Sequence, residues 1–241
     1  MDIIFGLGMA LPIVSTVAVS TVTGVAQGVS EQKKQNADAG NQARMLKFHL
    51  DVLIVDVSAR KPATKHLHGG IVTLHDDKLW IEDKSPITNQ PENVNRHPFT
   101  GFYVAYPDND RPYTRGLVST ISRDPPMLNW VYVDKDTLEC KYASRSGSIA
   151  HHVGSYDWTS EDAEDSNVTL DEFEGFIAVD EGKDKGWALY FDMDDDGLKG
   201  VKKGRRTCEV SLKRRILTAQ ETNKWGLKEE GNIGFKKTRE V

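Results

Sequence analysis

Three carboxylates at alternating positions are the side chains of this sequence best suited to binding a metal ion. Asp192, Asp194 and Asp196 are followed by Gly197, which is the spacing that begins an EF-hand calcium loop. Such a loop needs a glutamate at its twelfth position, where this sequence has Lys203, and the preceding run GWALYF favours a strand over a helix. A calcium loop of another type therefore stays open beside the simpler alternative, a solvated acidic turn.

A basic stretch follows this loop. Beside a membrane, Lys202, Lys203, Arg205 and Arg206 would contact anionic headgroups or a protein partner. The alternative is a set of exposed strand ends that neutralise the acidic loop. The whole stretch comprises Lys199, Lys202, Lys203, Arg205, Arg206, Lys213, Arg214 and Arg215, interrupted by the acidic Glu209.

Catalytic signatures do not accompany these residues. The sequence contains no G-x-S-x-G nucleophile elbow, no H-E-x-x-H metal motif and no glycine-rich phosphate loop. The formal charge of −5 does not favour nucleic-acid binding. We therefore predict a non-enzymatic protein with no cofactor other than the calcium considered above, and we identify no small-molecule substrate.

The first thirty residues differ in character from the rest. Residues 3–30 carry no charged side chain, although 28% of the whole chain is charged, and about 20 apolar residues suffice for a helix to cross a membrane. Thr16, Ser20, Gly24 and Gly28 lie four apart, a small-residue ladder that allows helices to pack closely. We predict that this segment is an apolar helix that self-associates into a homo-oligomer, either within a membrane or by packing between subunits. The alternatives are that the segment is a signal peptide or that it forms a strand in an assembly.

The charges behind this run predict an orientation. Lys33, Lys34, Arg44 and Lys47 follow it and no basic residue precedes it, which would leave the rest of the chain on the cytoplasmic face of a membrane. A soluble cytoplasmic assembly is the alternative. Two cysteines, Cys140 and Cys208, are too few for a disulfide framework and suggest buried thiols in a reducing, intracellular compartment, although one bridge between them stays open.

The remainder of the chain alternates apolar and polar residues with the period of two that marks half-buried strands. We predict a mainly β fold, an antiparallel β-sandwich or barrel of about ten strands preceded by the apolar helix, with no internal repeat of fixed period. The expected organisation is an N-terminal segment over 1–45, a β domain over 46–215 and a C-terminal tail over 216–241. The principal strand predictions are 46–57, 71–74, 79–81, 102–106, 117–121, 130–133, 138–142, 176–179, 187–191 and 207–212.

Aromatic residues on these strands are expected to lie in the core. Trp80, Trp130 and Trp187 fall on predicted strands, so burial is favoured over ligand stacking. The run Tyr156-Asp157-Trp158 is a candidate binding loop.

Three stretches carry a family resemblance: NWVYVDKDTLECKYASR, HHVGSYDWT and EGFIAVDEGKDKGWALYFDMDDDGL. Together they resemble a group of filamentous-fungal proteins of unknown function, over roughly residues 99–215. The resemblance implies a fungal, intracellular protein and carries no catalytic residues.

These observations support one leading hypothesis and two alternatives for function. The leading hypothesis is a structural, self-assembling protein held at a membrane by its N-terminal helix and displaying a cytoplasmic β domain. The first alternative is a calcium- or glycan-dependent binding module. The second is a pore-forming defence protein whose N-terminal helix acts on membranes.

Overall fold

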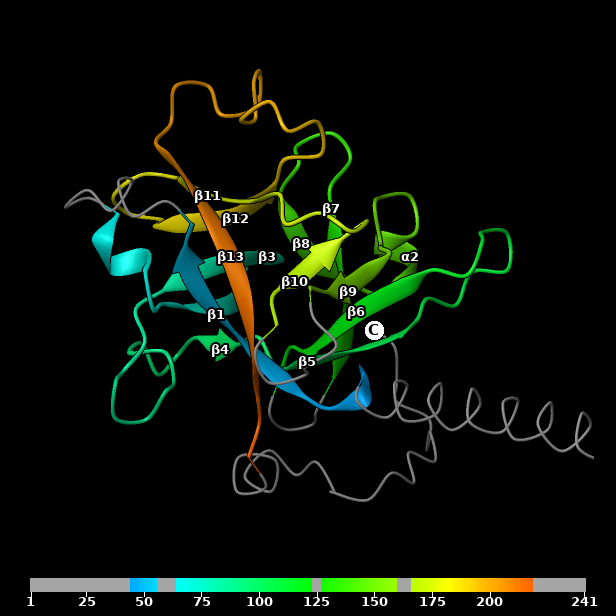
Figure 1. The fold of residues 1–241 in the computed structure, drawn as a ribbon, viewed down its shortest axis with the longest axis horizontal. Coiled ribbons are helices and arrows are strands. Elements are labelled where there is room, and N and C mark those ends of the chain that lie inside the picture. The colour runs from blue at the N-terminus through cyan, green and yellow to red at the C-terminus, as the bar shows by residue number, and fades with distance from the viewer. Residues whose placement is uncertain (1–43, 56–63, 123–126, 160–165, 219–241) are drawn as a thin grey trace, which may run out of the picture. The chain divides into compact units, whose positions relative to one another are not determined.

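The computed structural model describes residues 44–55, 64–122, 127–159 and 166–218, and these residues form an antiparallel β fold (Figure 1). A 3-10 turn, η2 (Lys65–Leu67), and a single helical turn, α2 (Arg145–Ser148), accompany the strands. The strands are β1 (Phe48–Ile54), β2 (Ile71–His75), β3 (Lys78–Glu82), β4 (His97–Pro98), β5 (Gly101–Ala105), β6 (Arg115–Thr120), β7 (Leu128–Val133), β8 (Cys140–Ala143), β9 (Tyr156–Trp158), β10 (Val168–Leu170), β11 (Phe176–Asp180), β12 (Trp187–Phe191) and β13 (Thr207–Ile216).

The predicted N-terminal helix, with Thr16, Ser20, Gly24 and Gly28, lies outside the described residues. Among the helices that the structure does describe, none combines the length and the apolar character needed to cross a bilayer.

Three pairs of strands form a barrel. Two pairs join strands that follow each other in the chain and run antiparallel, β5 with β6 and β9 with β10. The third pair joins the last described strand, β13, antiparallel to the first, β1. The pairs are joined by the contact of Phe48 with Gly101, by the bridge between Asn167 and Lys213, and by β9 lying beside β6. The first strand of the described fold thus pairs along its whole length with the last, from Phe48 with Ile216 to Ile54 with Val210.

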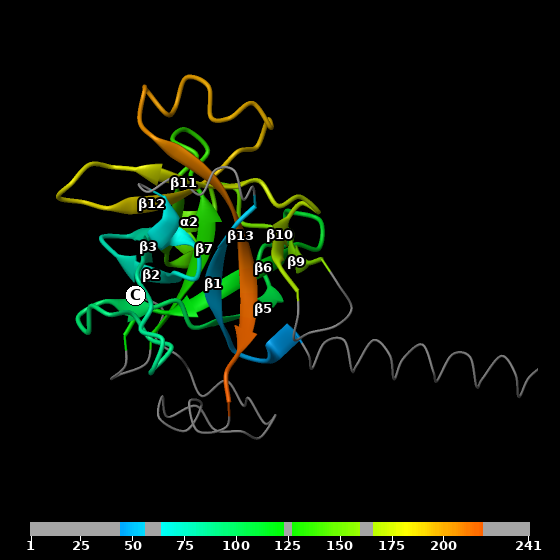
Figure 2. The ribbon, with the colours of Figure 1, turned by 60° about the vertical axis from the view of Figure 1, so that its left-hand side comes forward.

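Three hairpins gather at one end of this barrel: β2–β3, β7–β8 and β11–β12. Their second strands meet one another, because β3 pairs with β12 and with β8, and Glu139 forms a bridge with Tyr190. Figure 2 shows β2–β3 and β11–β12 side by side at this end. The three contacts close a triangle, so the hairpins form a cap.

The barrel and cap together repeat one four-strand pattern three times. Each unit has a barrel strand, a hairpin and a second barrel strand, and the units run over 48–105, 115–158 and 168–216. The remaining strand, the two-residue β4, lies in the first unit outside this pattern and pairs with β2. The prediction of a mainly β, antiparallel fold is confirmed, and the barrel is the form that it takes. The repeat escapes detection in the sequence because the connections between equivalent strands differ in length.

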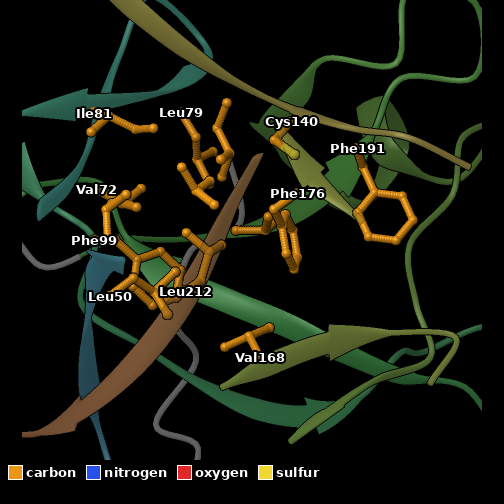
Figure 3. Close-up of a cluster of buried hydrophobic side chains, with 14 of the residues drawn as sticks. Leu50, Val72, Leu79, Ile81, Phe99, Cys140, Val168, Phe176, Phe191 and Leu212 are labelled. Atoms are coloured by element: carbon orange, nitrogen blue, oxygen red, sulfur yellow. The ribbon is translucent and has the colours of Figure 1, made fainter. Parts of the chain in front are cut away.

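The core fills the barrel with residues from all three units. Phe48, Leu50, Val52 and Ile54 alternate along β1 and are each less than 5% exposed. Figure 3 shows Leu50, Val168 and Leu212, from β1, β10 and β13, among the buried side chains. Burying such side chains stabilises the fold by about 1.5–3 kcal/mol each. Cys140 and Cys208 are free and buried, as one of the sequence alternatives expected.

Two local features show why these residues fold this way. The β2–β3 hairpin turns at Asp76 and Asp77, whose φ angles of 49° and 57° suit the tight two-residue turn that matches strand twist. Gly101 allows β5 to approach its neighbours, because a Cβ at this position would meet the carbonyl oxygen of Val118 at 2.1 Å. Both features fix the register of the strands that they join.

Candidate functional site

A cleft lies on the cap, where the β2–β3 hairpin meets the β11–β12 hairpin. It consists of two recesses that share Trp80 and Lys185, with volumes of about 360 and 300 Å³. The floor is built by the antiparallel pairing of Trp187 with Ile81 and of Ala188 with Trp80. Each recess lies at the lower end of the size range of small-molecule sites, roughly 300–1,000 Å³.

The larger recess combines indole surface with acids and an amide. Trp80 and Trp187 keep 6% and 7% of their surface exposed, so a small part of each indole reaches the recess while most of it packs in the fold. The remaining side chains come from η2, the end of β3, the loop that follows it and the β11–β12 turn. They are His66, Ile81, Glu82, Asp83, Glu92, Asn93 and Lys185, with Gly186 beside them.

An acid of the larger recess, Glu82, contacts two basic residues of the smaller recess, His75 and Arg96. Glu82 Oε1 lies 2.8 Å from Arg96 Nε and 3.9 Å from His75 Nε2. The His75 ring stacks on Trp80 with 4.7 Å between ring centroids and 9° between planes. Burial raises the pKa of Glu82, against the effect of Arg96, and burial lowers the pKa of His75. Both shifts favour the uncharged form of the group, which is the effect of burial.

A charged network holds the three hairpins together behind the cleft. Lys78 Nζ lies 2.6 Å from Glu139 Oε1 and 3.6 Å from Glu181 Oε1. The Tyr190 hydroxyl contacts both carboxylates, at 3.0 Å from Glu139 and 2.5 Å from Glu181, and Arg205 Nη1 lies 2.6 Å from Glu181. Burial alone would raise the pKa of Glu139, but the hydrogen bonds from its basic neighbours lower it.

The predicted calcium ligands occupy the turn after β12. Both carboxylate oxygens of Asp192 accept backbone N–H groups, from Asp196 at 3.2 Å and from Gly197 at 2.6 Å. Asp196 Oδ1 accepts the N–H of Lys199 at 2.9 Å, and Asp194 is exposed. Across the part of the chain that the structure describes, no group of three His, Cys, Asp or Glu residues is placed to hold a metal ion. The carboxylates hold the turn together, and calcium binding by them stays a prediction.

The predicted basic contacts divide between the network and the surface. Arg205 belongs to the network described above, and Arg206 pairs with Asp180 on β11 while its side chain is 62% exposed. Lys203 is exposed and Lys202 is half-buried. The two arginines neutralise Asp180 and Glu181, not the loop over 192–196 that the sequence alternative named.

The burial expected for two tryptophans is confirmed, whereas their place in the cleft was missed. Trp80 and Trp187 are buried and Trp130 is half-buried. Glu82, Glu92 and Lys185 were not identified as site residues from the sequence. The available signal was the sequence Trp-Ile-Glu-Asp, in which a buried aromatic strand runs directly into acids.

Comparison with known proteins agrees with this architecture. The model of a family described as the fungal beta-trefoil domain matches residues 24–218. No curated protein and no solved structure matches the chain. The matched residues include the region 99–215, over which the sequence resembles fungal proteins, and cover most of the chain. The name β-trefoil describes the arrangement seen here, in which three four-strand units surround a six-stranded barrel. The chain belongs to the fungal β-trefoil domain family.

Proposed function

We propose that this protein is a non-catalytic binding module that recognises a saccharide in the cleft between the β2–β3 and β11–β12 hairpins. The observation that carries the proposal is the convergence of indole surface, carboxylates, an amide and an ammonium group on one recess of about 360 Å³. Concave sites with a few convergent polar groups and shifted pKa values are the default candidates for ligand binding.

The chemistry of the lining fits a ligand rich in hydroxyl groups. A hydroxyl group both donates and accepts hydrogen bonds. Glu82, Asp83 and Glu92 supply acceptors, whereas Asn93 and Lys185 supply donors within the same recess. The exposed parts of Trp80 and Trp187 supply apolar surface for the C–H groups of a sugar ring.

The network behind the cleft would keep this lining in place. Lys78 and Trp80 lie on the same strand, and Glu181 and Lys185 belong to the β11–β12 hairpin. Rigid elements reduce the ordering cost that a ligand must offset on binding.

The test is isothermal titration of the full chain with a panel of neutral, acidic and amino monosaccharides and their disaccharides. Glu92 and Glu172 are both exposed glutamates, but only Glu92 lines the cleft. For a saccharide that binds, Glu92→Gln should weaken binding at least tenfold, or about 1.4 kcal/mol, and Glu172→Gln should leave it within twofold. Absence of binding across the panel, or equal loss in both variants, would refute the proposal.

A finer proposal concerns how the module is displayed. We propose that residues 3–30 anchor it at the cytoplasmic face of a membrane and associate through Thr16, Ser20, Gly24 and Gly28. The support is the charge-free sequence and its small-residue ladder. Replacing Gly24 and Gly28 with Leu should reduce the assembly size in light scattering, and deleting residues 1–30 should move the protein from pellet to supernatant. Unchanged size and distribution would argue against the anchor.

A further inference from the structure

A fully buried arginine occupies the barrel at the end opposite the hairpin cap, where β1 and β6 begin and β9 and β13 end. Arg214 is 0% exposed, and its guanidinium carbon lies 4.2, 4.8 and 5.4 Å from the ring centroids of Trp158, Phe48 and Tyr103. Its Nη1 donates to Ser166 Oγ at 3.0 Å, whereas its Nε and Nη2 have no hydrogen-bond acceptor among the described residues. A buried cation without a carboxylate partner is costly unless something else compensates its charge.

Two further arginines lie beside the same tryptophan. The Arg44 guanidinium carbon is 4.8 Å from the Trp158 ring, and its Nη2 is 3.8 Å from Asp157 Oδ1. Arg115 pairs with the other oxygen of Asp157. The Nε atoms of Arg44 and Arg115 are buried, and nothing in the described part of the chain accepts a hydrogen bond from them. Within those residues, four guanidinium nitrogens of this cluster are thus donors without acceptors.

The charges in this cluster do not balance. The groups that act electrostatically on Tyr103, at its centre, are Arg214, Arg115 and Arg44 on one side and Asp157 on the other. Among the described residues, one carboxylate therefore faces three guanidinium groups in this cluster, an excess of two positive charges. Burial lowers the pKa of Arg214, in keeping with a cation whose charge is incompletely compensated.

Access from solvent is retained on one side. The side chains of Arg44, Arg115 and Asp157 are 26%, 18% and 35% exposed, whereas Arg214 is fully buried against the Trp158 ring. An incoming anion would therefore meet Arg44 and Arg115 directly, and the charge of Arg214 would add to the attraction from within the barrel.

We propose that Arg44, Arg115 and Arg214 form an oxyanion site at this end of the barrel and that its ligand is a phosphate group. Guanidinium groups bind phosphate oxygens through paired, charge-assisted hydrogen bonds. A phosphate monoester carries a charge of about −1.5 to −2 at neutral pH, which matches this excess of two positive charges. This site is separate from the saccharide cleft on the cap and does not depend on it.

The experiment titrates the full chain with inorganic phosphate by calorimetry, with chloride replacing phosphate so that ionic strength is constant. Arg44→Gln removes a partly exposed member of the cluster, and Arg206→Gln is the matched control because Arg206 sits in a one-to-one pair with Asp180. We expect Arg44→Gln to weaken binding at least tenfold and Arg206→Gln to change it less than twofold.

A second arm identifies the source of the phosphate. Vesicles of phosphatidylcholine, with and without a phosphatidylinositol phosphate, are tested for sedimentation of the protein. Because residues 3–30 can themselves hold the chain on a vesicle, the readout is the gain in sedimentation on adding the phosphorylated lipid. A gain that is lost in Arg44→Gln assigns the site to a headgroup, whereas inorganic phosphate binding without a gain assigns it to a soluble phosphate compound.

The proposal fails if the unmodified chain binds neither probe, or if Arg206→Gln weakens binding as much as Arg44→Gln. If circular dichroism shows that Arg44→Gln is unfolded, Arg44→Lys takes its place. That variant keeps the charge but loses the paired donors, so binding should weaken several-fold; unchanged binding by a folded Arg44→Lys would also overturn the proposal.

Discussion

Tyr190→Phe measures how strongly the charged network joins the three hairpins of the cap. The substitution removes one hydroxyl group, which lies 3.0 Å from Glu139 Oε1, 2.5 Å from Glu181 Oε1 and 2.9 Å from Arg205 Nη1. Hydrogen bonds to charged groups contribute about 1.5–3 kcal/mol each, and the hydroxyl can donate its proton to only one carboxylate at a time. Since both carboxylates also keep basic partners, we expect a loss of about 2–3 kcal/mol in the free energy of unfolding.

Tyr103→Phe is the matched control for this prediction. Tyr103 and Tyr190 are both 1% exposed, but the Tyr103 hydroxyl donates to a neutral acceptor, the backbone oxygen of Asp157, at 3.1 Å. A neutral hydrogen bond contributes about 0.5–1.5 kcal/mol. Urea unfolding at pH 7 should therefore show Tyr190→Phe as the more damaging change, by about 0.5–2.5 kcal/mol. Equal losses would mean that the network adds nothing beyond a single ordinary hydrogen bond.

Three further predictions concern single groups. Burial would raise the pKa of Asp134, but Lys141 and backbone N–H groups lower it to about 2. The free energy of unfolding, measured in urea titrations, should therefore fall as the pH drops from about 4 to 2, and Asp134→Asn should flatten that fall. Burial lowers the pKa of Lys47 to about 8 in the folded protein, so above that pH the unfolded chain binds one more proton than the folded chain. The free energy of unfolding should therefore rise between pH 8 and about 10.4, and Lys47→Met should abolish the rise. Gly101→Ala places a methyl group 2.1 Å from the Val118 carbonyl oxygen, and thermal unfolding should show a loss of about 1–3 kcal/mol or more, whereas a neutral effect would contradict the close approach of β5 and β6.

Local patterning predicted most strands, because each was encoded within a few consecutive residues. The β2–β3 hairpin combines apolar runs with the turn residues Asp76 and Asp77, and the structure places it where the sequence did. By contrast, β4, β9 and β10 have only two or three residues each. Too few positions alternate in such short strands to reveal a period of two, and their pairing depends on partners elsewhere in the chain.

The cleft could not be predicted from local patterning, because long-range pairing creates it. Trp80 and Trp187 are more than a hundred positions apart and become neighbours only through the pairing of β3 with β12. Propensity and alternation identify both residues as core anchors, which they are. They say nothing of which two hairpins will meet, and therefore nothing of the acids that the meeting brings around the indoles.

Arg214 shows a different limit of sequence reasoning. Cys208, Val210 and Leu212 alternate as the inward face of β13, and the next inward position is Arg214. A hydrophobicity pattern places the end of the buried strand at Leu212 and assigns the arginine to a solvated basic stretch. The strand instead continues to Ile216, paired with β1 throughout, and carries the guanidinium into the barrel. Since leucine or methionine at this position would extend the core without the cost of burying a charge, the arginine contradicts the local rule that its neighbours follow. Such contradictions are expected where function, not folding, selects the residue, and this expectation favours the phosphate site over a purely structural role for Arg214.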